Sequence, residues 1–268
     1  MKTTFIEDIL SKLGILTSAF AVQSTIRLER SEIFSQVSYQ DDDVQPDYRL
    51  GDVNDQGVKN LIFDLGNVIV DLDIAKADEL LFNLTGSKYQ EAGDKDLQIF
   101  HDFEKGLVSE SIFLNHFIKK SAGRAQAIDI INAWNSMLVN IPWNRLEMMR
   151  HLMEHYQVFI LSNTNETHIR WTNHYIQTRY REAGFKSFVH HALYSHDLQA
   201  RKPDTEIFEK VLETYSLKPQ ETVFYDDNLE NVQAAKQIGI QAIQVHPEDE
   251  ILAMVGHLPH AHVSKKVP

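Results

Sequence analysis

Six side chains that could take part in chemistry stand after, or close to, short apolar runs of the sequence. They are Asp64, Ser162, Asn163, Lys202, Asp226 and Asp227. Asp64 stands in F-D-L-G-N-V, the serine and asparagine in L-S-N-T-N, the lysine in A-R-K-P-D and the acidic pair in V-F-Y-D-D-N. Residues that follow the strands of an open parallel sheet gather at its carboxyl edge, where ligands bind. The sequence therefore predicts one pocket that holds three carboxylates, a lysine and a hydroxyl.

Carboxylates crowded into one pocket repel one another unless a cation lies among them. A few oxygen ligands, with room left for water and phosphate, suit magnesium. A phosphate monoester fits such a site, because the cation offsets the repulsion between an attacking aspartate and the anionic ester. Lys202 and Ser162 would then hold the phosphoryl oxygens, and the backbone N–H groups of Leu65, Gly66 and Asn67 could add donors.

Five short apolar runs are separated mostly by helical patterns, which predicts an α/β fold with a Rossmann-like parallel sheet. These runs are Asn60–Asp64, Gln157–Leu161, Ala192–Ser195, Thr222–Asp226 and Gln241–Val245. Between Asp73 and Pro142 the apolar residues keep a helical spacing, and no strand is evident. This segment predicts a small helical cap inserted after the first strand.

The chain is expected to have four parts: an N-terminal extension, a core in two segments, a helical cap and a C-terminal tail. Their ranges are 1–57, 58–74 with 147–250, 75–146 and 251–268. The extension would contain a short helix over residues 3–17 and a polar linker over 36–57. Glu7, Asp8 and Lys12 interrupt the apolar stretch that a secretory signal would need, so a cytoplasmic location is expected.

The composition limits the partners of the protein. The chain has 268 residues, of which 43% are hydrophobic, and a formal net charge of −12. This charge would repel nucleic acid and acidic membranes, so neither is expected as a partner. The absence of cysteine excludes thiolate nucleophiles and cysteine-based zinc sites. A small-molecule phosphate ester is the expected partner, and the sequence leaves the oligomeric state open.

With the four motifs in this order, residues 58–250 resemble the haloacid dehalogenase superfamily of aspartate-nucleophile hydrolases. The resemblance implies that Asp64 is the nucleophile, and that Ser162 and Lys202 are the hydroxyl and the lysine of the second and third motifs. Ser162, Asn163, Lys202 and the backbone of Gly66 would bind the substrate. The helical segment also resembles the small cap that many members carry after the first motif.

The same resemblance implies a magnesium site. Its ligands would come from the Asp64 carboxylate, the Gly66 carbonyl and the acidic pair Asp226-Asp227, with Asp227 in direct contact with the ion. Asn231, one helical turn after Asp227, either supports it or faces solvent.

Gly66 departs from the usual phosphatase motif of the superfamily, which has a second aspartate two residues after the nucleophile. That aspartate protonates the leaving alkoxide, so its absence should cost on the order of 10²–10⁴ in rate unless another group replaces it. Asp71, Asp73, His101 and Glu104 are candidates for such a group.

The stretch F-D-L-G-N-V-I-V-D also resembles one branch of the superfamily in which this glycine is expected. This branch contains the glucose-1-phosphate-phosphatase-like proteins, which are related to the phosphatase domains fused to epoxide hydrolases. An anomeric phosphate leaves as a hemiacetal, which is a better leaving group than an ordinary alcohol. The resemblance therefore suggests substrates that tolerate weak acid assistance.

Two other functions compete with a phosphatase. A dehalogenase of the same superfamily also lacks the second aspartate and needs no metal, but such relatives do not usually carry an acidic pair at the position of Asp226-Asp227. A catalytically weak binding or regulatory module would contact a partner through residues 1–57, and Gly66 would then mark lost chemistry. Retention of the nucleophile, the lysine and both acids favours a magnesium-dependent phosphatase of small metabolites, such as sugar phosphates.

Overall fold

A computed structural model describes residues 57–246, 250–256 and 258 of the chain. The helix predicted over residues 3–17, all but the last residue of the linker predicted over 36–57, and most of the predicted tail lie outside this part. No helix within the described ranges is long and apolar enough to cross a membrane.

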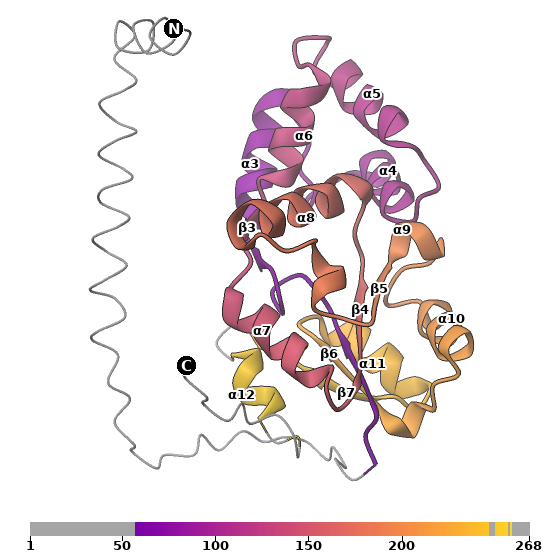
Figure 1. Ribbon diagram of the computed structural model, residues 1–268. Helices are drawn as coiled ribbons and strands as arrows, with labels where there is room; N and C mark the ends of the chain where they lie inside the picture. The colour runs from indigo at the N-terminus through magenta and orange to yellow at the C-terminus, as the bar shows by residue number, and fades with distance from the viewer. Residues whose placement is uncertain (1–56, 247–249, 257, 259–268) are drawn as a thin grey trace, which may run out of the picture. The chain divides into compact units, whose positions relative to one another are not determined.

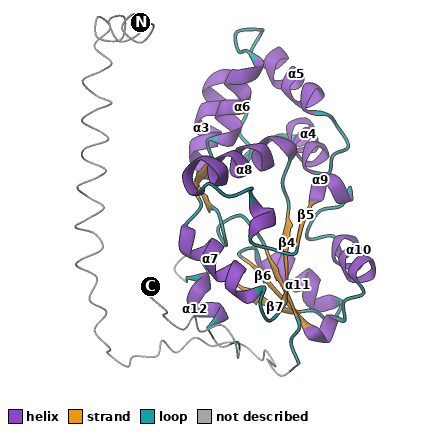
Figure 2. Ribbon diagram, in the orientation of Figure 1, coloured by secondary structure: helices purple, strands orange, loops and turns teal. Residues whose placement is uncertain are grey.

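A parallel sheet forms the core of the described chain (Figure 1, Figure 2). Its strands are β1 Asn60–Phe63, β4 Gln157–Ser162, β5 His191–Tyr194, β6 Thr222–Asp226 and β7 Gln241–Gln244. Their order across the sheet is β5-β4-β1-β6-β7, and every neighbouring pair is parallel. The predicted α/β, Rossmann-like fold is confirmed, and all five predicted strands are present.

Successive side chains of the central strands pack into two different apolar clusters, as the two-residue period of a strand requires. In β1, Leu61 and Phe63 belong to one cluster and Ile62 to the other. Helices α7 (Trp143–Leu152) and α12 (Ile251–Val255) contribute to the first cluster. Helices α10 (Thr205–Tyr215) and α11 (Leu229–Gln237) contribute to the second, so the sheet is covered on both faces.

Helix α12 lies where the sequence predicted only a tail. Ile251, Met254 and Val255 are buried in the first cluster, and the helix packs against α7. Five residues are too few to show a helical period, which is why the pattern was not evident in the sequence.

Four helices follow β1 and form the cap, in the upper part of Figure 1. They are α3 Ile74–Thr85, α4 Asp94–Glu104, α5 Glu110–Lys120 and α6 Ala127–Asn135. At the base of the cap, β2 (Asp71–Leu72) pairs with β3 (Leu138–Asn140) in an antiparallel ribbon. The prediction of no strand between Asp73 and Pro142 was therefore wrong. In β3 only Leu138 is buried, so this strand produces no apolar run.

The remaining elements connect the strands around the site. They are α8 Glu166–Tyr180, α9 Ser195–Leu198 and the 3₁₀ turns Phe185–Ser187 and Pro219–Glu221. After β1 the chain adds β4 and β5 on one side, and later β6 and β7 on the other. The residues that follow β1, β4 and β6 therefore lie where the direction of strand addition reverses, the usual place for a ligand in this architecture.

Candidate active site

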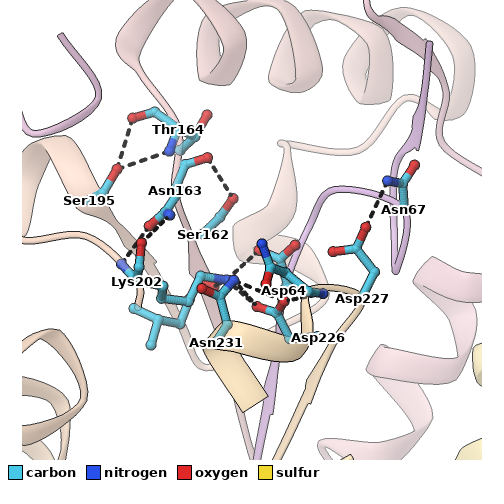
Figure 3. Close-up of polar contacts among 12 residues, drawn as sticks. Asp64, Asn67, Ser162, Asn163, Thr164, Ser195, Lys202, Asp226, Asp227 and Asn231 are labelled. Atoms are coloured by element: carbon cyan, nitrogen blue, oxygen red, sulfur yellow. Dashed lines mark hydrogen bonds and ion pairs between the residues drawn. The ribbon is translucent and has the colours of Figure 1, made fainter. Parts of the chain in front are cut away.

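Lys202 lies at the centre of the predicted site and contacts two of its three acids (Figure 3). The Lys202 Nζ donates to Asp64 Oδ1 and to Asp226 Oδ2, both at 2.6 Å, and to the Leu161 carbonyl at 2.9 Å. Its side chain is only 1% exposed. Because an ammonium group has three N–H donors, all of them are used. The lysine is thus fixed against the carboxyl ends of β1 and β6.

Asp226 is fully buried and its carboxylate is bonded on both oxygens. Oδ1 accepts from the Asn228 backbone N–H at 2.8 Å and from Asn231 Nδ2 at 2.9 Å. Oδ2 accepts from Lys202, and Asn231 Nδ2 lies 3.1 Å from it. Asn231 therefore supports Asp226 rather than Asp227, which differs from both alternatives drawn from the sequence.

Asp227 is only partly buried and has fewer protein partners than Asp226. Its Oδ2 accepts a hydrogen bond from Asn67 Nδ2 at 2.8 Å, and no hydrogen bond joins it to Lys202. Asn67 immediately follows Gly66 and has a positive φ of 54°. The Asn67–Asp227 bond thus joins the turn after β1 to the turn after β6.

The three acids could together hold a metal ion. One carboxylate oxygen from each of Asp64, Asp226 and Asp227 lies within 4.8 Å of the others. One lysine against three carboxylates leaves a formal surplus of two negative charges. A set of carboxylate oxygens with this surplus fits a hard divalent cation such as magnesium.

Burial and charge act on the pKa values of these groups in opposite directions. Burial raises the pKa of Asp64 to about 7, against the lowering effect of Lys202. Burial also raises the pKa of Asp227, although the bond from Asn67 lowers it. For Lys202, burial alone would lower the pKa, but Asp226 and Asp64 outweigh it and raise the pKa above its ordinary value. The ammonium therefore stays charged, whereas burial raises the pKa of the Asp64 and Asp227 carboxyls.

Ser162 and Asn163 follow β4 and have different environments. Ser162 lines the site, and its Oγ makes only a long contact of 3.5 Å with the Asn163 carbonyl. The Asn163 side chain forms two bonds of 2.8 Å with the backbone of Lys202, one to its carbonyl and one from its N–H. The Asn163 amide thus holds the segment that carries Lys202. Asn163 also lines the cavity beside Asp64, and its contact with substrate stays a prediction.

The backbone of Gly66 does not require glycine, because this residue is not among the glycines with positive φ. A Cβ at this position would lie 2.8 Å from Leu72 Cδ1 and 3.7 Å from Asp64 Oδ2. Of the backbone donors expected in this turn, the Asn67 N–H is already bonded to the Val70 carbonyl at 2.8 Å. The site can therefore draw at most on the N–H groups of Leu65 and Gly66.

A cavity of about 320 Å³ extends from Asp64 to residues of the cap. Tyr89, Glu104 and Trp134 of the cap line it, together with His168 and Arg201 of the core. Of this group, only Glu104 was expected from the sequence. Arg201 could have been suspected because it precedes Lys202, but the others carried no local signal.

The four residues that could replace the missing second aspartate as proton donor lie in different environments. Asp71 is bonded to Arg145 Nη1 at 2.7 Å, and Asp73 caps α3 by accepting from the Lys76 N–H. His101 is not among the residues that line the cavity, whereas Glu104 is. Burial raises the pKa of Glu104, with Arg201 opposing the shift.

Ser195 joins the loop after β4 to the cap. Its buried hydroxyl donates to the Glu104 carbonyl at 2.5 Å and accepts from the Thr164 N–H at 2.9 Å (Figure 3). Arg201 Nη2 lies 3.2 Å from Glu104 Oε2, which gives a second connection between cap and core. The end of α4 is thus held beside the candidate site.

Comparison with known proteins finds a matching family model and a related phosphatase. Residues 58–239 match the model of the haloacid dehalogenase-like hydrolase family. The D-ribitol-5-phosphate phosphatase of Bacteroides thetaiotaomicron is 27% identical over 191 residues, which cover 70% of this chain and 91% of that protein.

Two solved structures are also similar. The HAD family enzyme bt-2542 of Bacteroides thetaiotaomicron, in complex with magnesium and inorganic phosphate, is 30% identical with a TM-score of 0.64. This match covers 72% of this chain and 97% of that one. A predicted HAD-like family hydrolase from Porphyromonas gingivalis is 24% identical with a TM-score of 0.68, over 75% of this chain and 98% of the other, and supports the fold alone.

Proposed function

The chain belongs to the haloacid dehalogenase-like hydrolases, and from this membership we propose that it is a magnesium-dependent phosphatase of small phosphate monoesters. The observation that carries the proposal is the position of Lys202 Nζ, 2.6 Å from both Asp64 and Asp226, beside a third carboxylate. Such an arrangement combines a candidate nucleophile, a fixed cation and a metal-binding set of oxygens. The phosphatase and the magnesium complex among the similar proteins support the same assignment.

The proposed reaction has two steps at phosphorus. A carboxylate oxygen of Asp64 attacks the phosphorus, the bond to the leaving oxygen breaks, and an aspartyl phosphate forms. Water then attacks the same phosphorus, which releases phosphate and restores the carboxylate. Lys202 keeps its charge throughout and balances negative charge on Asp64 and the phosphoryl group, and the Ser162 hydroxyl can donate to a phosphoryl oxygen.

The magnesium ligands would be Asp64, the Gly66 carbonyl and Asp227, because the Asp227 carboxylate is less buried than that of Asp226 and is not bonded to Lys202. Asp226 would lie near the ion without direct contact, because its oxygens already accept hydrogen bonds from Lys202, Asn228 and Asn231. When bound, the ion would offset the repulsion between the anionic nucleophile and the anionic ester.

We further propose a sugar phosphate or sugar-alcohol phosphate as the substrate. The similar phosphatase of Bacteroides thetaiotaomicron acts, by its name, on D-ribitol 5-phosphate, the ester of a primary alcohol. An anomeric phosphate is the alternative, because Gly66 supplies no acid for the leaving group. The two differ in how much they need a proton, so they can be separated by experiment.

The test is phosphate release over a panel of phosphorylated metabolites, with magnesium and with excess chelator, for wild type and Asp64→Asn. Wild type should require magnesium. The variant should keep its fold by circular dichroism but lose activity, because the attacking oxygen is gone while the volume is almost unchanged. Retention of more than about a tenth of the turnover would exclude the route through Asp64. Full activity in chelator would remove the assignment and favour a dehalogenase, which halide release from 2-haloacids would reveal.

A further inference from the structure

The cavity is lined by apolar and by polar side chains, and these two sets of residues are here called its apolar wall and its polar wall. Apolar side chains of the cap base and α8 form the first: Leu72, Met137, Leu138 and Ile169. Tyr89, Glu104 and Arg201 provide the second, beside the indole of Trp134. A ligand that fits between such walls needs both C–H surface and hydrogen-bonding groups.

The polar wall combines two cap residues, Tyr89 and Glu104, with Arg201 of the core. Lys202 and Arg201 are neighbours in the chain, but Lys202 Nζ reaches Asp64 whereas Arg201 Nη2 reaches Glu104 at the end of α4. Asp64, Lys202, Glu104 and Arg201 line the same cavity, so the leaving group of an ester held by Asp64 and Lys202 can reach Glu104 and Arg201.

Two polar atoms of this wall lack a hydrogen-bond partner. Arg201 Nε and Trp134 Nε1 are covered from solvent and make no hydrogen bond among the described residues. Glu104 Oε2 has only its ion pair with Arg201, and Tyr89 reaches Glu104 Oε1 at a long 3.5 Å. Buried polar groups without partners are costly, and in native proteins they call for an explanation. Rotation of these side chains toward bound hydroxyls would supply the missing partners.

The charge of the wall restricts which groups it can take. Glu104 and Arg201 compensate each other, so an additional carboxylate or ammonium on a ligand would meet one like charge and gain no net attraction. A ligand hydroxyl can accept a hydrogen bond from Arg201 or Trp134 and donate one to Glu104. Two neighbouring hydroxyls of a ligand could therefore bond to two of these groups at once.

We propose that Glu104, Arg201 and Tyr89 form a subsite for the hydroxyl groups of an uncharged, polyhydroxylated leaving group. This assignment rests on the proposed phosphatase function and narrows its substrate to phosphates of neutral polyols or sugars. Glu104 of the cap and Arg201 of the core would then determine which leaving groups the enzyme accepts.

The alternative is that the Glu104–Arg201 pair only joins cap to core. Lys105 and Asp204 form another such pair, at 3.6 Å, and neither residue lines the cavity. Lys105→Met is therefore the matched control, because it removes a cap–core ion pair next to Glu104 without touching the subsite.

The experiment measures kcat/KM for D-ribitol 5-phosphate and for n-pentyl phosphate, two esters of primary alcohols with the same chain length, with p-nitrophenyl phosphate as a third substrate. Wild type should prefer the polyol ester by on the order of 10²-fold, because a site built for hydroxyls leaves buried groups unpaired when they are missing. Glu104→Gln should lower this preference at least about tenfold. Tyr89→Phe should lower it less, and Lys105→Met should leave both rates and preference unchanged.

Equal wild-type rates for the two alkyl esters would overturn the subsite. So would an equal loss for all three substrates in Glu104→Gln, which is the result of a structural connection. If Glu104→Gln fails to fold, the wild-type preference and Tyr89→Phe still decide. A wild-type protein that hydrolyses none of the three esters contradicts the phosphatase itself, which separates the two failures.

Discussion

Replacing Lys202 with methionine should destabilise the metal-free protein strongly. The change keeps the length and apolar stem of the side chain but removes the ammonium that bonds to Asp64 and Asp226. Asp64 is 8% exposed and Asp226 is fully buried, so neither carboxylate can recover its hydration. Removal of one partner from a buried ion pair costs about 3–5 kcal/mol. We expect a loss in this range at neutral pH.

The loss is measured by urea denaturation in EDTA, with tryptophan fluorescence and far-UV circular dichroism as independent probes. Lys210→Met is the matched control: its ion pair with Glu206 is more than a third exposed, and solvent screens such a pair, so its loss should change stability little. Magnesium should stabilise Lys202→Met more than wild type, because the ion then meets carboxylates that nothing else balances. A loss below about 1 kcal/mol in EDTA, or equal stabilisation of both proteins by magnesium, would refute this electrostatic account.

Further predictions concern the metal, the leaving group, the glycine after the nucleophile and a buried histidine. Asp227→Asn should weaken magnesium activation more than Asp226→Asn, as magnesium titrations of activity will show; the reverse order would assign the direct contact to Asp226. Turnover should rise steeply as the pKa of the leaving alcohol falls, and a flat dependence across a series of esters would indicate that a protein group supplies the proton. Gly66→Asp should lower activity because its Cβ meets Leu72 at 2.8 Å, and adding Leu72→Ala should recover part of it; no recovery would discount the clash. Burial lowers the pKa of His168 to about 4. As the pH falls below 6.5, His168 of the unfolded chain therefore takes up a proton, whereas in the folded protein it stays neutral down to about pH 4. The contribution of His168 to stability should therefore be complete above pH 6.5, and about 3 kcal/mol of it should be lost as the pH falls to 4. His168→Gln should remove this contribution to the pH dependence in urea titrations; an unchanged slope would exclude His168 as its source.

The parts that could be predicted from the sequence are those with a local signal. Buried parallel strands are apolar runs, so β1, β4 and β6 could be located, and the residues after them had to meet at one edge of the sheet. The order of the motifs alone was therefore enough to predict that Asp64, Ser162 and Asp226 lie together. The glycine at 66 was visible, but the contact that a side chain there would make with Leu72 was not.

The rest depends on contacts between distant segments. Asn163 holds the backbone of a residue 39 positions later, and Asn67 bonds to Asp227 across 160 positions. No periodicity or motif spacing encodes such pairs, because they follow from the order of strands in the sheet. The cap shows the same limit: amphipathic spacing indicates helices, but it does not tell that Glu104 faces Arg201 rather than solvent.

The central claim is a covalent phosphoryl group on Asp64, and trapping it tests the claim most directly. Wild type is mixed with p-nitrophenyl phosphate and magnesium, quenched during turnover and treated with borohydride, which reduces an acyl phosphate of aspartate to homoserine. Peptide mass spectrometry should then find homoserine at position 64, and only when ester and magnesium are both present. Continued turnover with no reduced residue, or with the change at Asp226 or Asp227 instead, would contradict the account.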